Sequence, residues 1–243
     1  MLYAALAAIV GGLATVTTRL KLERQRGRRR AARQLPDGPI IVISNHTSYA
    51  DGVLLALACR RMGRSLRLLA TSGVFRAPVI GAIARRLGFI PVMRGGPSAA
   101  HALDAAVEAL AAGEAVGLYP EGHITRDPEM WPERAKSGAV RLALRSGAPI
   151  VPVAMVGAHD VVGRRRIARQ MLSNLVRRPR VHVEVGEPIL VRRLVTSDTP
   201  PPGEIRRAAD AVMSELVALV ATLRGESPDH PSGVSAAALR AGA

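Results

Sequence analysis

A histidine and an aspartate lie five residues apart, directly after the apolar run 40–43. The two residues are His46 and Asp51. A histidine side chain titrates at about pH 6.5, so it can act as a general base near neutral pH while a carboxylate orients its ring. On a helix of 3.6 residues per turn the two side chains would point roughly 140° apart, so the chain must turn between them. The spacing indicates a base and its orienting acid on a loop. The alternative is a turn in which Asn45 and Ser48 serve only as turn or cap residues.

Two further polar segments follow apolar runs. Glu121 and Gly122 follow the apolar run 115–119 and Pro120, and Arg126 lies four residues beyond the glycine. A proline and a glycine so close together are typical of a turn that shapes a loop. Arg94 follows the apolar run 89–93 and precedes two glycines, and a guanidinium in this position can bind a phosphate. Each segment taken alone also fits an ordinary polar connection.

The alternation of short apolar runs with helical stretches predicts the scaffold. We predict strands at 40–44, 66–70, 89–93, 115–119, 149–156 and 181–185, and helices at 52–62, 76–87, 98–112 and 132–145. This order predicts one α/β domain with a central, largely parallel or mixed sheet flanked by helices. Sites in such sheets gather beyond the carboxyl ends of strands, where His46, Arg94 and Glu121 all fall.

The composition limits the class of protein. With 243 residues, 48% of them hydrophobic, the chain can fill the core of one domain. The 34 Lys and Arg residues against 19 Asp and Glu give a net charge of +15, which favours an anionic partner. Aromatic residues make up only 2%, so a stacking surface for nucleic acid is not expected. Cys59 is the single cysteine, which excludes an intrachain disulfide and a thiol cluster for zinc.

Residues 2–18 carry no charge, and arginines crowd in after them. A secretory signal would carry its positive charge before the apolar stretch, so we expect a retained N-terminal membrane-associated helix. A helix of this length measures about 26 Å, slightly less than the roughly 30 Å hydrocarbon core, so it fits either a membrane span or an interfacial helix. We assign 1–34 to this anchor and its basic flank, 35–224 to the catalytic domain and 225–243 to a disordered tail. The basic flank predicts that the domain lies at the cytoplasmic face of the cell membrane. A buried N-terminal core helix is the alternative.

Together these segments resemble the glycerolipid acyltransferase family, which includes the 1-acylglycerol-3-phosphate acyltransferases. Four blocks match in order: Asn45-His46 through Asp51; Gly88, Ile90 and Arg94; Tyr119-Pro120-Glu121-Gly122; and Val151-Pro152-Val153-Ala154. Lys136 begins a segment similar to the basic-x-glycine helix start of the family. The resemblance covers about residues 35–195. Two departures are Met93, where the family often has an acid, and Arg126, two positions later than the usual arginine.

The resemblance implies an O-acyltransferase acting on lipids. The acyl donor would be acyl-coenzyme A or an acyl carrier protein, and the acceptor a lysophospholipid, most simply 1-acylglycerol-3-phosphate giving phosphatidic acid. His46 would take the proton of the acceptor hydroxyl, and Asp51 would orient the ring and stabilise the imidazolium. We expect no cofactor, no metal and no nucleic acid as partner.

The remaining matched residues would bind the acceptor. The resemblance implies that Arg94 and Arg126 hold its phosphate, with Lys136 as a further contact. Glu121 and Gly122 would shape the pocket and contact the glycerol oxygens of the acceptor.

Three alternatives stay open. A related acyltransferase could use another lipid acceptor, such as a glycolipid or a lipoamino acid. A metal-dependent hydrolase could use His46, Asp51, Glu121 and His123 as ligands. A non-catalytic binding module could account for the charge, to which the segment 163–178 contributes six arginines in the pattern of either a membrane-surface helix or an ordinary solvated one.

Overall fold

The computed structural model describes residues 18–23, 34–92, 98–162, 170, 173–174 and 176–226. Within them a seven-stranded sheet forms in the order β1-β7-β6-β2-β5-β3-β4. The strands are β1 (Arg19–Leu22), β2 (Ile40–Ser44), β3 (Leu66–Thr71), β4 (Ile90–Val92), β5 (Ala115–Leu118), β6 (Ile150–Val156) and β7 (Arg180–Val185). Strands β2 to β6 are parallel, β7 is antiparallel to β6, and β1 is parallel to β7. The predicted α/β domain with a mixed sheet is confirmed.

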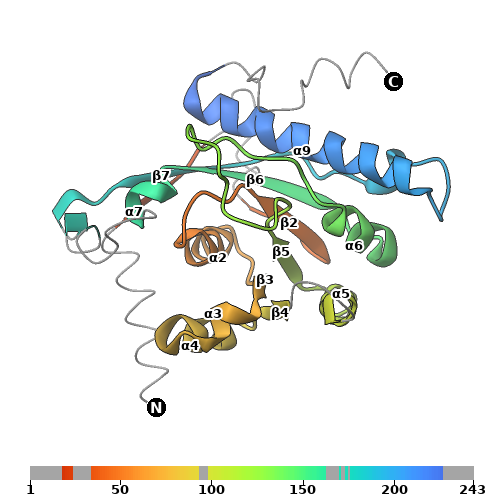
Figure 1. Cartoon of the computed structure of the whole chain (residues 1–243), viewed down its shortest axis with the longest axis horizontal. Helices are drawn as coiled ribbons and strands as arrows, with labels where there is room; N and C mark the ends of the chain where they lie inside the picture. The colour runs from red at the N-terminus through yellow and green to blue at the C-terminus, as the bar shows by residue number, and fades with distance from the viewer. Residues whose placement is uncertain are drawn as a thin grey trace.

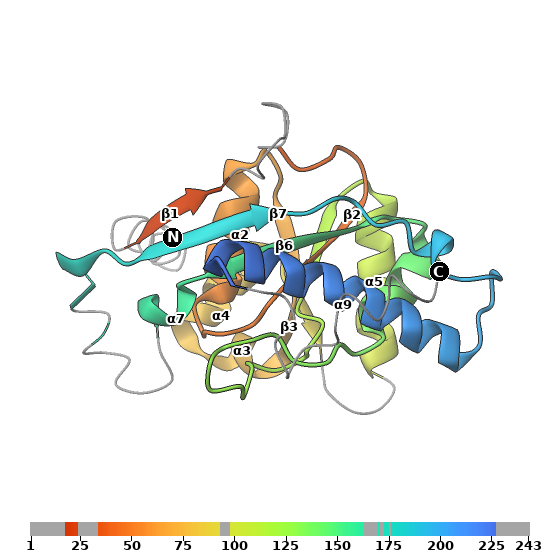
Figure 2. The same cartoon turned by 90° about the horizontal axis from the view of Figure 1, so that it is seen from above.

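Helices cover both faces of this sheet (Figure 1). They are α2 (Asp51–Arg61), α3 (Ser72–Arg76), α4 (Pro78–Arg86), α5 (Ser98–Ala111), α6 (Gly138–Ser146), α7 (Ala158–Val161) and α9 (Pro202–Arg224), with a 3-10 turn η2 (Val191–Arg193). Helices α5, α6 and α9 pack on one face, whereas α2, α4 and α7 pack on the other. Seen from above, α9 lies over the sheet beside β6 (Figure 2).

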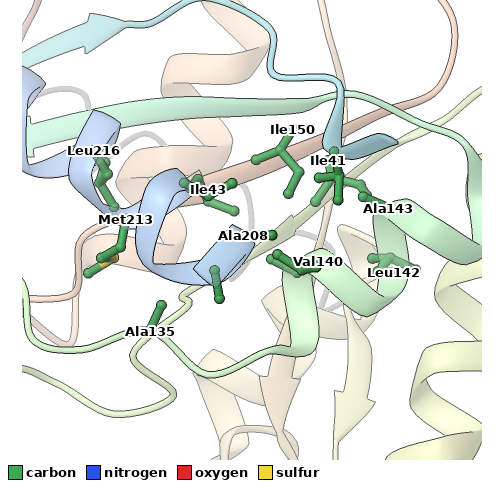
Figure 3. Close-up of a cluster of buried hydrophobic side chains, with 14 of the residues drawn as sticks. Ile41, Ile43, Ala135, Val140, Leu142, Ala143, Ile150, Ala208, Met213 and Leu216 are labelled. Carbon is green, nitrogen blue, oxygen red and sulfur yellow. The ribbon is translucent and has the colours of Figure 1, made fainter. Parts of the chain in front are cut away.

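Strand β2 forms the centre of the core because every one of its residues is buried. Its side chains alternate between the faces, so Ile41 and Ile43 join the cluster under α6 and α9, while Ile40 and Val42 join the cluster under α2. Figure 3 shows the first cluster, with Ile41 and Ile43 directed toward the side chains of α6 and α9. Each fully buried aliphatic side chain contributes about 1.5–3 kcal/mol, so the strand preceding the candidate pair is firmly held.

Several elements differ from those predicted. The helix predicted at 76–87 is present as α4 from Pro78 to Arg86, and a separate short helix, α3, precedes it and ends at Arg76, because Pro78 begins a new helix. The helix predicted at 132–145 begins only at Gly138, since backbone groups of the preceding segment bond to the loop after β5. Helix α9 and strand β1 were not predicted. Strand β1 lies in the segment assigned to the basic flank, so the sheet includes residues before position 35.

Several predictions fall outside the described residues. They concern residues 1–17 and 24–33 of the anchor and flank, Arg94, the stretch 163–169 and the tail from 227 onward. Among the helices that the structure describes, none combines the length and the apolar character needed to cross a bilayer.

The parallel strands bring four loops to one edge of the sheet. Strands β2, β3, β5 and β6 all end at this edge, and each is followed by a loop or a helix start. The loops that follow β2 and β5 carry most of the polar residues singled out in the sequence. The fold therefore brings together residues that lie about 75 positions apart in the chain, such as His46 and Glu121.

Candidate active site

The side chains of His46 and Asp51 meet in a hydrogen bond. Nδ1 of His46 lies 2.8 Å from Oδ2 of Asp51, and the chain turns between them because Asp51 is the first residue of α2. The carboxylate is fully buried, whereas one fifth of the histidine side chain is exposed. When Nδ1 carries a proton donated to Asp51, Nε2 is the nitrogen left with a lone pair for a substrate hydroxyl.

The backbone also holds the Asp51 carboxylate. The amide N–H groups of Thr47 and Ser48 donate to Oδ2 at 2.6 and 2.7 Å. Hydrogen bonds from backbone amides favour the ionised form of a carboxyl group. The loop after β2 therefore wraps around the acid that orients the histidine.

The main chain of His46 is fixed by the loop after β5. Its N–H donates to Oε1 of Glu121 at 3.0 Å, and its carbonyl accepts from the N–H of Thr125 at 2.7 Å. The other oxygen of Glu121 accepts from the N–H of Glu133 at 3.0 Å. Glu121 is fully buried, and this burial raises the pKa of its carboxyl to about 8, although the two backbone donors oppose the shift. This geometry favours a positioning role for Glu121 rather than direct contact with a substrate.

Asn45 and Ser48 tie the same loop to strand β6 and the segment after it. The side-chain amide of Asn45 donates to the carbonyl of Met155 and accepts from its N–H, both at 2.8 Å. The hydroxyl of Ser48 donates to the carbonyl of Val162 at 2.6 Å. Asn45 and Ser48 are therefore structural residues, but they connect distant segments instead of serving only as turn or cap residues, and they do so beside the His46–Asp51 pair.

Tyr119 packs against the face of the His46 ring. The two ring centroids lie 4.1 Å apart and the planes are inclined by only 14°. The sequence marked Tyr119 as part of a matched block but gave no sign of this stacking, because the contact joins two loops that are distant in the chain. The imidazole is thus held at one edge by Asp51 and on one face by Tyr119.

His123 forms a second histidine–acid pair with a different character. Its Nε2 lies 2.9 Å from Oε2 of Glu133, and its Nδ1 lies 3.0 Å from the carbonyl of Glu121. Both ring nitrogens are therefore engaged within the loop. Glu133 itself receives a bond from the backbone N–H of Arg126, which is the largest cause of its lowered pKa. Sequence reasoning missed Glu133, since an acid in a polar loop carries no distinguishing pattern.

Basic side chains lie close to this loop. Lys136 extends over Gly122, so a Cβ placed on that glycine would lie 2.9 Å from the lysine Nζ. Gly122 adopts a positive φ of 72°, which favours glycine. Arg126 and Lys136 are both exposed, so their charged groups are accessible to an anionic ligand. Arg94, the third predicted phosphate ligand, lies outside the described residues.

Two further observations bear on other chemistries that the sequence allowed. Cys59 is buried in α2 as predicted, and burial raises the pKa of its thiol to about 12, so it is not a nucleophile near neutral pH. In the part of the chain that the structure describes, no three His, Cys, Asp or Glu side chains are grouped to hold a metal ion. Of the four ligands considered, Glu121 and His123 already use both polar side-chain atoms within the protein.

The fold and the buried histidine–acid pair at its carboxyl edge define an α/β protein with a candidate acid–base site. The Acyltransferase family model matches residues 23–156, more than half of the chain, and the match includes His46, Asp51 and Glu121. The chain therefore belongs to the glycerolipid acyltransferase family, as the four blocks predicted.

Individual relatives agree with this assignment. The chain is 31% identical over 127 residues to a chloroplastic 1-acyl-sn-glycerol-3-phosphate acyltransferase of Brassica napus, covering 52% of this chain and 35% of that one. It is 30% identical over 166 residues to the N-acylphosphatidylethanolamine synthase of Arabidopsis thaliana, covering 63% and 57%. The match thus spans about a third of the Brassica protein.

The fold is shared with a solved structure. The 1-acyl-sn-glycerophosphate acyltransferase PlsC from Thermotoga maritima superposes with a TM-score of 0.62, covering 91% of this chain and 80% of that one at 19% identity. This likeness shows a common acyltransferase fold.

Proposed function

We propose that this acyltransferase moves a fatty acyl group from an acyl thioester to the free hydroxyl of 1-acylglycerol-3-phosphate, giving phosphatidic acid. The observation that carries the proposal is the bond between Nδ1 of His46 and the buried Asp51, because it leaves Nε2 as the ring nitrogen that can take the proton of an acceptor hydroxyl. The relative from Brassica napus that bears this activity in its name supports the choice of acceptor.

The reaction needs one base and one leaving-group acid, and His46 supplies both. Nε2 takes the proton from the acceptor hydroxyl as its oxygen bonds to the thioester carbonyl carbon. The carbon–sulfur bond then breaks, and the imidazolium returns the proton to the leaving sulfur. Asp51 holds the ring in one tautomer and stabilises the transient positive charge. No covalent acyl-enzyme forms in this sequence of steps.

The exposed cations beside the loop after β5 would bind the acceptor phosphate. We assign this role to Arg126 and Lys136, and Arg94 stays a prediction for the same role. Gly122 would keep the lysine close to the loop, since any side chain there would displace it. We assign Glu121 to the support of the His46 backbone and expect no bound cofactor beyond the acyl donor, either acyl-coenzyme A or an acyl carrier protein.

A second acceptor is supported by a specific observation. The relative from Arabidopsis thaliana is named for the N-acylation of phosphatidylethanolamine, and it matches a larger share of this chain than the relative from Brassica napus does. The same base could take a proton from another lipid hydroxyl or from an amine. Incubation of the full chain with labelled acyl-coenzyme A and a panel of lysophospholipids, phosphatidylethanolamine and glycolipids distinguishes these acceptors. Label recovered in phosphatidic acid alone supports the proposal, and label recovered in N-acylphosphatidylethanolamine replaces it.

The acceptor lipids place the reaction at a membrane surface, so we propose association with the cytoplasmic face of the cell membrane. The net charge of +15 would favour an anionic leaflet. Membrane fractionation followed by alkaline carbonate separates the two predicted modes. Release of the chain by carbonate indicates an interfacial segment at 2–18, whereas retention indicates a span. Recovery in the soluble fraction contradicts membrane association.

A further inference from the structure

Tyr119 stacks on one face of the His46 ring, the proposed base. It follows β5 directly, and its ring lies nearly parallel to the His46 ring at a centroid distance of 4.1 Å. The tyrosine side chain also packs against the core cluster under α2, and this packing fixes the position of its ring. Tyr119 therefore presents a rigid aromatic face to the imidazole.

The hydroxyl of Tyr119 takes no part in a proton transfer. Its oxygen is buried, and it has no hydrogen-bond partner among the described residues. Burial raises the pKa of this hydroxyl well above its ordinary value of 10, and the nearby Asp51, Cys59 and Glu121 add to the shift. The side chain thus stays neutral at working pH, so its aromatic face is the part that can act on His46.

An aromatic face attracts a cation. The π-electrons give the face a partial negative charge, and a cation within about 6 Å of the ring centroid is stabilised by it. The His46 ring lies inside that distance, and in the proposed reaction it becomes a cation when it takes the proton of the acceptor. An interaction present with the imidazolium but weak with the neutral ring lowers the barrier without tightening substrate binding.

We propose that Tyr119 is a positioning residue that strengthens His46 as a base by stabilising the imidazolium against its ring face. This inference rests on the proposed role of His46. Tyr119 itself exchanges no proton: the proton moves from the acceptor hydroxyl to Nε2 and then to the leaving sulfur. Among the described residues, the charged and titratable groups that act on the two rings are Asp51 and Cys59 in α2 and Glu121 in the loop after β5. Substitutions at position 119 leave all three in place.

Three variants of the full chain separate the ring face from the hydroxyl and from simple packing. Tyr119→Phe keeps the face and removes the hydroxyl. Tyr119→Leu removes the face. Pentafluorophenylalanine incorporated at position 119 keeps the shape of phenylalanine but reverses the charge of the face, so it tests the proposal even if the leucine variant fails to fold.

The readouts are the NMR titration midpoint of the His46 ring, identified by its loss in His46→Ala, and the acidic limb of the kcat/KM profile. We expect Tyr119→Phe to match the wild type. We expect the leucine and pentafluorophenylalanine variants to move both readouts to lower pH by about half to one unit, with kcat lowered about threefold to tenfold.

Equal midpoints in the Phe and pentafluorophenylalanine variants would overturn the inference, because shape alone would then explain the stacking. A midpoint that moves in Tyr119→Phe would overturn it as well, since the hydroxyl would then be responsible. The titration does not require turnover, so this result is independent of the acceptor. Full activity in His46→Ala would instead refute the proposed function.

Discussion

Oδ2 of Asp51 accepts a hydrogen bond from His46 Nδ1 at 2.8 Å while it also accepts from the backbone amides of Thr47 and Ser48. One carboxylate oxygen therefore orients the proposed base and closes the turn that brings the base to it. The same side chain has a structural and a chemical role, and these can be separated by the choice of substitution.

Asp51→Asn should remove the chemical role and keep the structural one. An asparagine oxygen can still accept from the two amides, but it carries no charge to stabilise the imidazolium, so we expect the rate of acyl transfer to fall by about 10²–10⁴. The free energy of unfolding should change little. Asp51→Ala should lose activity and also about 2–6 kcal/mol of stability, because two backbone donors are left unpaired. Urea unfolding beside initial-rate assays checks both variants, and equal stability of the two would contradict the proposed division of roles.

Asn45→Ala should destabilise the loop that carries His46. The substitution leaves the N–H and carbonyl of Met155 without their side-chain partner inside the protein, at a cost of about 2–6 kcal/mol in unfolding free energy. Asn174→Ala is a matched control, since Asn174 donates to the carbonyls of Asp160 and Val161 in α7. Both variants should unfold at lower urea concentration. Only Asn45→Ala should also lower kcat under conditions where the chain is folded, and an equal loss of kcat in the control would argue against the proposed positioning.

Glu121 should make stability depend on pH. Its pKa is raised from 4.5 to about 8, so between these values the folded chain holds a proton that the unfolded chain has released. The contribution of Glu121 to the free energy of unfolding is therefore fully present below about pH 4.5 and is lost as the pH rises through about 8. In Glu121→Gln this component is absent. Thermal unfolding of both proteins from pH 5 to 9 should show a difference in unfolding free energy that changes steadily with pH, and parallel curves would show that the carboxyl is already ionised.

Gly122→Ala should disturb Lys136. Both Gly122 and Gly113 have positive φ values, so an alanine at either position costs about 1–2 kcal/mol. A Cβ at position 113 meets no atom within 4 Å, whereas at position 122 it lies 2.9 Å from the lysine Nζ. We expect Gly122→Ala, but not Gly113→Ala, to raise the KM for the anionic acceptor by about tenfold. Steady-state kinetics with Lys136→Gln provides the reference, and an unchanged KM in both Lys136→Gln and Gly122→Ala would remove the lysine from the proposed site.

The local sequence pattern was sufficient to predict the strands that are buried on both faces. The run 40–44 predicted β2 because a continuous β-branched segment suits a central strand. The contact of His46 with Asp51 was also predicted, as that of a base with its orienting acid. Because a continuous helix would hold the two side chains apart, the sequence also predicted the turn between them. Helix α9 was missed although Pro202 and Gly225 mark its ends and Ile205, Ala208 and Val212 follow a helical period.

The contacts that Glu121 and Tyr119 make with His46 could not be predicted from the sequence. Both depend on the loop after β5 folding back against the loop after β2, which joins residues more than 70 positions apart. A glutamate in a polar loop suggests contact with solvent or substrate, yet here its carboxylate is fully buried by that long-range packing. Tertiary contacts of this kind leave no periodic signal in the chain.

The most direct test of the central claim is the initial rate of phosphatidic acid formation from labelled acyl-coenzyme A and 1-acylglycerol-3-phosphate, measured for the wild type and His46→Ala. Circular dichroism should show that the variant is folded, because the ring of His46 is partly exposed and its main-chain bonds to Glu121 and Thr125 remain. We expect the wild type to form phosphatidic acid and the variant to be slower by about 10²–10⁴-fold. A folded variant that retains more than about a tenth of the wild-type rate, well outside that range, would contradict the assignment of His46 as the base.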